Sequence, residues 1–128
     1  VRTEPAATTL VNLATNLYTD APADQTFTVT LLGRPVRIHA HAQQWTWHEG
    51  DGQTQTTSSP GRRGSTDITH TYRRPGMVDL SVDITWSGTY EVPGAAAPLP
   101  VRGTATTIGR PSALRVDQAR SAYQSGGG

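Results

Sequence analysis

The sequence contains no cysteine, which excludes a disulfide framework, a cysteine nucleophile and any metal site built on thiolates. It also contains no lysine, so every Lys/Arg position is an arginine. No apolar run reaches the ~18 residues of a membrane-spanning helix, and we expect no membrane insertion of this chain. Because Val1 and not Met begins the sequence, we expect that an upstream piece was removed, either a signal peptide or part of a larger parent chain.

Charge of either sign is scarce as well. Charged residues make up 16% of the chain and the net charge is +1. So small a net charge creates no global field that would draw the protein to nucleic acid or to an anionic membrane. We therefore expect no nucleic-acid partner. The length of 128 residues favours a single domain with a core of its own.

What the sequence does contain indicates β-strands. Threonine, a strand-favouring residue, occurs 20 times, whereas apolar residues make up only 34%. Residues 27–42 have the alternation of a β-hairpin, with apolar side chains at odd positions from Phe27 to Leu31 and at even positions from Val36 to Ala42. Gly33-Arg34 offers the turn between them.

The next two tryptophans, Trp45 and Trp47, lie at odd positions and so break the parity of the strand before them. A strand that kept its register would point them outward, so we expect a bulge near Gln43-Gln44. The polar segment 53–67 then predicts a loop, with a short edge strand at its start.

The strongest pattern runs from Met77 to Val92. Apolar side chains occupy the even positions from Val78 to Trp86 and resume at Tyr90, with polar residues between them. This alternation is typical of a half-buried strand, and Gly88 indicates a bulge within it. The apolar positions of residues 99–105 predict a return strand after a turn.

The sequence therefore predicts an all-β protein, a β-sandwich of two antiparallel sheets, with a short C-terminal helical segment. Residues 1–7 are expected to be a flexible tail, and residues 8–112 to form the sandwich. Residues 113–124 are expected to be an extension that packs on the sandwich or on a partner, with Asp117 as a helix cap. Residues 125–128 are glycine-rich and are expected to be a second flexible tail.

Several short motifs occur in an order that resembles the PKD domain, an Ig-like β-sandwich module of bacterial surface and secreted proteins. The motif residues are Trp47, Gly50, Asp51, Gly52, His70, Tyr72, Pro75 and Gly76, followed by the alternating strand. The resemblance covers about residues 27–108, and the chain as a whole resembles actinobacterial PKD-containing exported proteins. His48 and Glu49 depart from the family, which usually has Asp and Phe there. The resemblance implies a secreted or cell-surface protein.

Each motif residue has a structural interpretation. Trp47 is expected to fill the core, and Tyr72 resembles a tyrosine-corner residue whose hydroxyl bonds nearby backbone. Glycines on both sides of Asp51 permit positive φ angles, and the aspartate can bond backbone amides in an Asx turn. His70 is expected to be buried and hydrogen-bonded. A calcium loop would need more oxygen ligands than Glu49 and Asp51, and a phosphate loop would need a lysine.

The remaining histidines and serines raise two further kinds of site. His39 and His41 share a strand face and could chelate a transition metal if His48 supplied a third ligand, although no carboxylate or cysteine stands at ligand spacing. A catalytic triad can be written from Ser81 or Ser87 with His70 and Asp83. However, both serines lie within a regular strand, and no sequence feature activates either hydroxyl as a nucleophile. We expect no cofactor, no physiological metal and no enzymatic activity.

Two functions remain open. The chain is either a surface module that contacts protein or glycan, or a self-assembling subunit of a surface fibre, pilus or sheath that docks through its terminal segments. A spacer role ranks below both. Trp86 and Tyr90 either form a stacking platform or extend the core, and their inward parity favours the core. The arginines at 62, 63, 73 and 74 form a basic loop end that is either solvated or meets an acidic partner.

The ribbon of residues 84–92 and 99–107 is longer than a normal sandwich strand pair, so its far end should project beyond the core. Projecting apolar surface is normally covered in soluble proteins. We expect the cover to be the C-terminal segment, with Ala122 and Tyr123 in contact, or another copy, or a partner.

Overall fold

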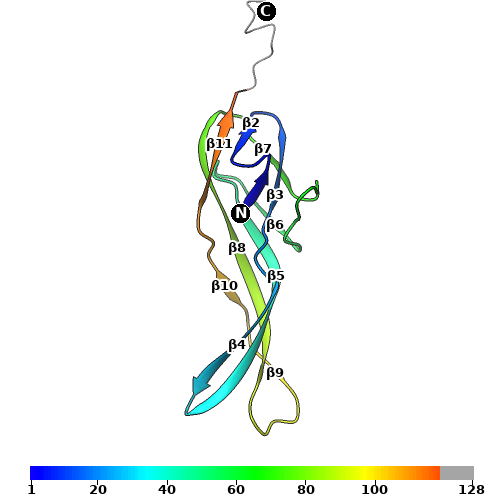
Figure 1. Cartoon of the computed structure of the whole chain (residues 1–128), viewed down its shortest axis with the longest axis vertical. Helices are drawn as coiled ribbons and strands as arrows, with labels where there is room; N and C mark the ends of the chain where they lie inside the picture. The colour runs from blue at the N-terminus through cyan, green and yellow to red at the C-terminus, as the bar shows by residue number, and fades with distance from the viewer. Residues whose placement is uncertain (119–128) are drawn as a thin grey trace, which may run out of the picture.

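The computed structural model describes residues 1–118, and within that range the chain is all-β, with eleven strands and no helix. The strands are β1 (Arg2–Glu4), β2 (Thr8–Leu10), β3 (Ala14–Tyr18), β4 (Asp24–Leu31), β5 (Arg34–His48), β6 (Thr54–Thr57), β7 (Thr69–Thr71), β8 (Gly76–Glu91), β9 (Leu99–Pro100), β10 (Ala105–Thr107) and β11 (Ser112–Asp117). Figure 1 shows that they build an elongated molecule along two long central strands, β5 and β8.

The strands form two sheets. The smaller sheet has the order β1-β3-β7, and the larger has the order β2-β11-β8-β5-β4, with β6 added to β5 and with β9 and β10 added to β8. All pairs are antiparallel except β2 and β11, which run parallel. The expectation of two purely antiparallel sheets was therefore wrong for the larger one. Parallel pairing needs a long connection, and these two strands lie at opposite ends of the described chain.

A bulge in β5 keeps its apolar residues on one face. Ala42 lies opposite Trp86 and Gln44 lies opposite Thr85, so one extra residue is inserted between Ala42 and Gln44. Beyond the bulge, Trp45 lies opposite Ile84, and it therefore shares a face with Ala42 despite the change of parity. The bulge predicted near residues 43–44 is confirmed.

Gly88, in contrast, does not mark a bulge. It lies opposite Ala40 in an unbroken register with β5. A Cβ atom at this position would stand 2.7 Å from the carbonyl oxygen of His39, so glycine is needed because two backbones approach closely. The hairpin turn between β4 and β5 also falls one residue earlier than predicted, at Leu32 and Gly33, which both have positive φ angles.

The core draws on both sheets and lies in the half of the molecule where they face each other. Leu17 comes from the smaller sheet, whereas Trp47, Leu80 and Leu114 come from the larger one, and all four are at most 1% exposed. The buried cluster is completed by Ala42, Trp45, Ile68, Tyr72, Val82, Ile84, Trp86 and Val116.

Residues 1–7 and 113–117 are more ordered than the sequence predicted. Residues 1–7 are not a loose tail, because β1 pairs with β3, and the Glu4 carboxylate accepts hydrogen bonds from the Asn16 side chain and the backbone N–H of Gly64. Residues 113–117 are not a separate extension, because they belong to β11, in which Leu114 and Val116 are buried. Such short strands are ordered by pairing with other strands, and their own residue pattern does not predict that pairing.

Asp117 ends β11 and caps no helix within the described range. The rest of the predicted helical segment, with Ala122 and Tyr123, lies outside the described residues, as do residues 125–128. Residues 9–20, whose weak apolar pattern predicts a single strand, contribute instead to two strands, β2 and β3, separated by a turn in which Asn12 has a φ of 66°.

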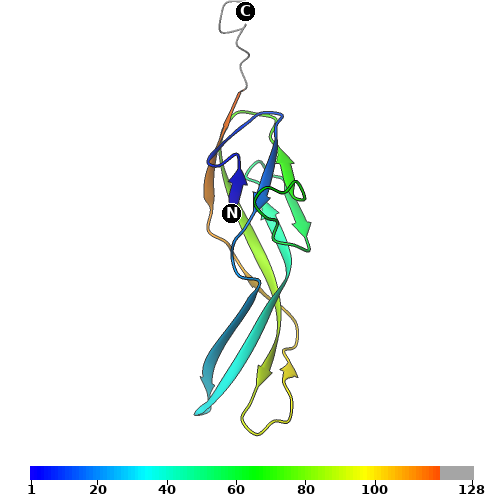
Figure 2. The same cartoon turned by 45° about the vertical axis from the view of Figure 1, so that its right-hand side comes forward.

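The hairpin of β4 and β5 and the far end of β8 with β9 project away from the smaller sheet (Figures 1 and 2). β11 pairs with residues Gly76 to Leu80, at the opposite end of β8, so residues 113–117 do not cover the projecting end. The contacts expected from Ala122 and Tyr123 fall on residues outside the described range. β9, β10 and β11 follow one another antiparallel to β8, so the chain leaves the tip as it runs towards its C-terminus.

Among residues 1–118 there is no helix with the length and apolar character needed to span a membrane.

Trp47 offers a test of the core. It is 1% exposed, and its indole Nε1–H donates to Thr57 Oγ1 at 2.9 Å. Trp47→Ala should cost about 3–5 kcal/mol because it removes a large buried side chain. Trp47→Phe should cost less, since it retains apolar contact and loses mainly the hydrogen bond. Urea denaturation measures both, and an unchanged midpoint for Trp47→Ala would contradict the assigned core.

Candidate functional site

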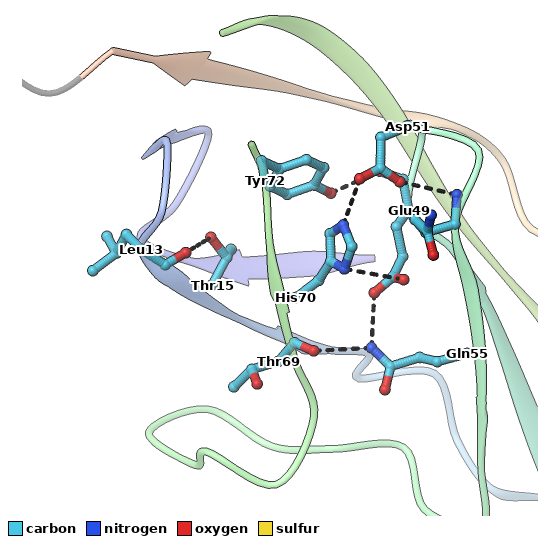
Figure 3. Close-up of polar contacts among 9 residues, drawn as sticks. Leu13, Thr15, Glu49, Asp51, Gln55, Thr69, His70 and Tyr72 are labelled. Carbon is cyan, nitrogen blue, oxygen red and sulfur yellow. Dashed lines mark hydrogen bonds and ion pairs between the residues drawn. The ribbon is translucent and has the colours of Figure 1, made fainter. Parts of the chain in front are cut away.

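The turn that follows β5 and the middle of β7 come together in a polar cluster (Figure 3). His70 lies between two carboxylates, with Nε2 at 2.6 Å from Asp51 Oδ2 and Nδ1 at 3.2 Å from Glu49 Oε1. His70 belongs to the smaller sheet, whereas Glu49 follows directly from the larger sheet. The cluster thus ties the two sheets together at one end of the core.

Asp51 holds the turn by its other oxygen. Its Oδ1 accepts the backbone N–H of Gln53 at 3.0 Å, which is an Asx-type turn, and Gly50 and Gly52 beside it have φ angles of 84° and 87°. Burial alone would raise the pKa of the Asp51 carboxyl. The hydrogen bond and the charge of His70, together with backbone N–H groups, outweigh burial and hold this pKa below its usual range.

Glu49 is the residue whose role the sequence argument missed. It is 2% exposed, and its Oε2 accepts a 2.7 Å hydrogen bond from Gln55 Nε2, which also donates to the carbonyl of Thr69 at 3.0 Å. Burial raises the pKa of Glu49. Parity could have identified it, because Glu49 continues the inward positions of Trp45 and Trp47.

The contact between Glu49 and His70 requires a proton. Two bare acceptors would repel at 3.2 Å, so the contact is favourable when one proton lies on either the imidazole nitrogen or the carboxyl oxygen. The raised pKa of Glu49 fits this requirement. A proton held between the two groups lowers the free-energy cost of burying them side by side.

Tyr72 closes the cluster on the core side. It is 1% exposed, its hydroxyl donates to the carbonyl of Glu49 at 2.7 Å, and its ring meets that of His70 edge-to-face with centroids 4.6 Å apart. Burial, followed by the charges of Asp51 and Glu49, raises the pKa of the phenol well above its usual range. Tyr72 remains a neutral donor at any physiological pH.

A cleft of about 610 Å³ lies beside the cluster. Asp51 and His70 form one side, whereas Arg73, Arg74 and Pro75 from the connection to β8 form another. His70 is 14% exposed at its side chain, so the cleft reaches its edge. In the described part of the chain no three histidine, cysteine or acidic residues are placed to hold a metal ion.

The other histidines are each paired with a separate acid. His39 lies 3.3 Å from Glu91, His41 lies 2.6 Å from Asp24, and His48 lies 2.8 Å from Asp83. The structure therefore does not bring His48 to the pair on β5, and the three imidazoles form no common site.

The serine triad written from the sequence is not assembled. Asp83 bonds His48 and the backbone N–H of Gly109, whereas His70 is in the other sheet and bonds Asp51. Ser81 lies opposite His48, but no side-chain hydrogen bond joins the two among residues 1–118. Ser87 lies further along β8, opposite His41.

The residues predicted as possible partner contacts lie in different environments. Trp86 is 9% exposed and donates its indole N–H to Thr107 Oγ1 at 3.0 Å, so it is part of the core. Tyr90 is half-buried on the projecting ribbon. Tyr123 lies outside the described residues. Arg62 and Arg63 are exposed on the loop before β7.

No protein-family model matches the chain, and comparisons with curated proteins and with solved structures give no match either.

Two glycines flank Asp51 in the same left-handed conformation, which gives a matched test. A Cβ at Gly50 would stand 2.7 Å from the carbonyl oxygen of Asp79, whereas a Cβ at Gly52 meets nothing within 4 Å. Gly52→Ala should cost about 1–2 kcal/mol of backbone strain. Gly50→Ala should cost about 1–3 kcal/mol more because of the clash. Equal losses of unfolding free energy would contradict the observed packing of the turn against β8.

Asp51→Asn tests the electrostatics of the cluster. A carboxyl whose folded pKa is lowered stabilises the fold above its unfolded pKa of about 3.9, and this contribution disappears as the pH falls through the folded pKa. The substitution should therefore cost on the order of 1 kcal/mol at pH 7, and the difference should shrink below about pH 4. Thermal melts from pH 3 to pH 7 measure the effect. A difference independent of pH would contradict it.

Proposed function

We propose that the chain is a non-catalytic interaction module, a PKD-like member of the Ig-like β-sandwiches, that acts at the cell surface or after secretion and makes protein contacts. The buried Trp47, the Asx turn at Asp51 and the bond from Tyr72 to the backbone of Glu49 support the PKD-like assignment. The secreted or surface location rests on that resemblance.

The proposal that the chain is not an enzyme is supported by the hydrogen bonds and ion pairs within the polar cluster. His70 has a carboxylate at each ring nitrogen, Gln55 bridges Glu49 and the backbone of β7, and the Tyr72 hydroxyl is engaged with backbone. Groups engaged in this way hold a structure together, and within residues 1–118 the hydrogen bond and ion pairs of the His70 ring are to carboxylates and not to a hydroxyl that it could activate.

The observation that supports a contact function is that the apolar side of the larger sheet extends beyond the smaller sheet that covers it. The inward side of β5 and β8 is buried between the sheets at Trp47 and Val82. The same side continues through Ala42 and Trp86 to Ile38 and Tyr90, on the part that projects beyond the smaller sheet (Figure 2). Apolar surface that a monomer leaves open in this way marks an interaction site.

We call this continuation the ribbon face. It is formed by Phe27, Val29, Leu31, Val36, Ile38, Tyr90 and Leu99, of which Val36 is buried. Phe27 is 47% exposed, Leu31 57% and Leu99 43%, so the flanking strands are more open than the central ones. Few hydrogen-bonding groups lie on it, and the indole N–H of Trp86 is already bonded. Sugar recognition needs convergent polar groups, so the ribbon face favours a protein partner over a glycan.

The alternative of a subunit that assembles through its terminal segments has less support at the N-terminal end. β1 is paired with β3, and β2 is paired with β11, so residues 1–10 offer no unpaired strand to donate.

A surface-directed crosslink tests the proposed function. Because the chain has no native cysteine, Phe27→Cys can carry a single benzophenone-maleimide on the ribbon face, and Thr28→Cys carries it on the opposite face of the same strand. Irradiation in the cell-wall fraction of the producing cells should give a protein adduct from position 27 and little from position 28. Mass spectrometry identifies the adduct. No adduct from either position, or equal adducts from both, would refute contact through the ribbon face.

A further inference from the structure

We infer that the ribbon face packs against the ribbon face of a second copy of this chain. The inference rests on the proposed contact function and names its partner. Two projecting ribbons would then form the second sheet layer that each lacks.

The ribbon face has the continuity that sheet packing requires. Phe27 on β4, Ile38 on β5, Tyr90 on β8 and Leu99 on β9 lie opposite one another in turn and form one apolar row across four strands. Val29 lies opposite Val36 in a second row. Apolar rows of this kind interdigitate with those of a facing sheet about 10 Å away.

Charges on the ribbon are segregated to its opposite side. Register places Arg37, His39 and Glu91 together there, where Glu91 lies 4.0 Å from Arg37 and 3.3 Å from His39. His41 is paired with Asp24 on the same side. A partner that binds through electrostatic complementarity would therefore contact the charged side of the ribbon and not the ribbon face.

An identical face meets no like charge when it packs on the ribbon face. Arg34 lies on this side only at the extreme tip, opposite Leu31 and beside the turn, where it would fall on the rim of the packed pair. An uncharged apolar centre with charge confined to the rim or the far side is the pattern of homodimer interfaces, which are more apolar than contacts between different proteins.

The chain also shows what kind of layer fits this sheet. Over the upper half the cover is another sheet, β1-β3-β7, which joins the larger sheet in one apolar core. In the lower half, no strand of residues 1–118 takes that place. The lower half of a second copy has the same twist and chemistry, and two sheets of equal twist pack face to face with their strands about 30° apart.

The area of the ribbon face sets the expected affinity between the two copies. Three strands about 27 Å long at about 4.8 Å spacing, with the two-residue β9 at their side, give a face on the order of 400 Å² per copy. Standard stable interfaces bury about 800 Å² per partner, so the pair should be reversible, with a dissociation constant on the order of 10–100 μM.

Sedimentation velocity of the purified full chain tests the inference. The wild-type protein should shift from monomer to dimer between about 5 μM and about 1 mM. Phe27→Asp places a charge on one flank of the apolar row in both copies and should weaken association by at least about tenfold. Thr28→Asp adds the same charge to the same strand on the opposite side, and it should change the constant less than about twofold.

Leu99→Asp, from the other flank of the face, provides a second variant and should weaken association like Phe27→Asp. Circular dichroism and thermal melts establish that each variant is folded. A wild-type chain that stays monomeric at about 1 mM would overturn the inference, and so would a dimer that both ribbon-face variants leave intact. Equal weakening by Thr28→Asp would also overturn it, in favour of pairing through the free edge of β4.

The two proposals can fail separately. If the purified chain is monomeric while position 27 crosslinks to a different protein, the contact function stands and the second copy is wrong. If position 27 gives no adduct and the purified chain is monomeric, both are wrong.

Discussion

The pairing of β5 with β8 is the interaction on which the rest of the structure depends. These strands have 15 and 16 residues, and each remaining strand of the larger sheet joins one of them directly or through β11. Their common inward side supplies most of the large apolar side chains of the core. The bulge at Gln43 is essential to this arrangement, because without it the tryptophans of β5 would face away from Val82 and Ile84.

The pairing of β5 with β8 does not by itself fix the position of the smaller sheet over the larger one. Apolar packing through Leu17, Ile68 and Tyr72 provides the attraction, and the polar cluster of Glu49, Asp51 and His70 adds direction. Hydrogen bonds have strict geometry, whereas apolar contacts tolerate sliding, so a buried polar link selects one relative position of the sheets. Burial of Glu49 is compensated by Gln55 and by the proton that it shares with His70.

The length of the central strands has a consequence for function. A ladder that is longer than the sheet packed against it must leave apolar surface uncovered, and here that surface is the ribbon face. Edge and face exposure of this kind is normally avoided in soluble proteins. The ribbon face lies on the part of the larger sheet that projects beyond the smaller sheet (Figure 2), whereas the polar cluster lies where β7 of the smaller sheet meets the end of β5. The part of the molecule that we propose for contact is therefore separate from the part that joins the two sheets.

The sequence by itself determined the strands that are long or strongly alternating. The period of two between Val78 and Trp86, and the parity change before Trp45, needed only local geometry to be interpreted. It did not determine the short strands β1, β2 and β11, because a strand of a few residues exists only through its pairing partner, and those partners are distant in the chain. The candidate site divides in the same way. The turn at Asp51 follows from glycine and aspartate chemistry within a few residues. The assembly of Glu49, Gln55 and His70 required three segments to meet, and only the tertiary structure decided that a glutamate on the inward face would find both an amide and an imidazole there.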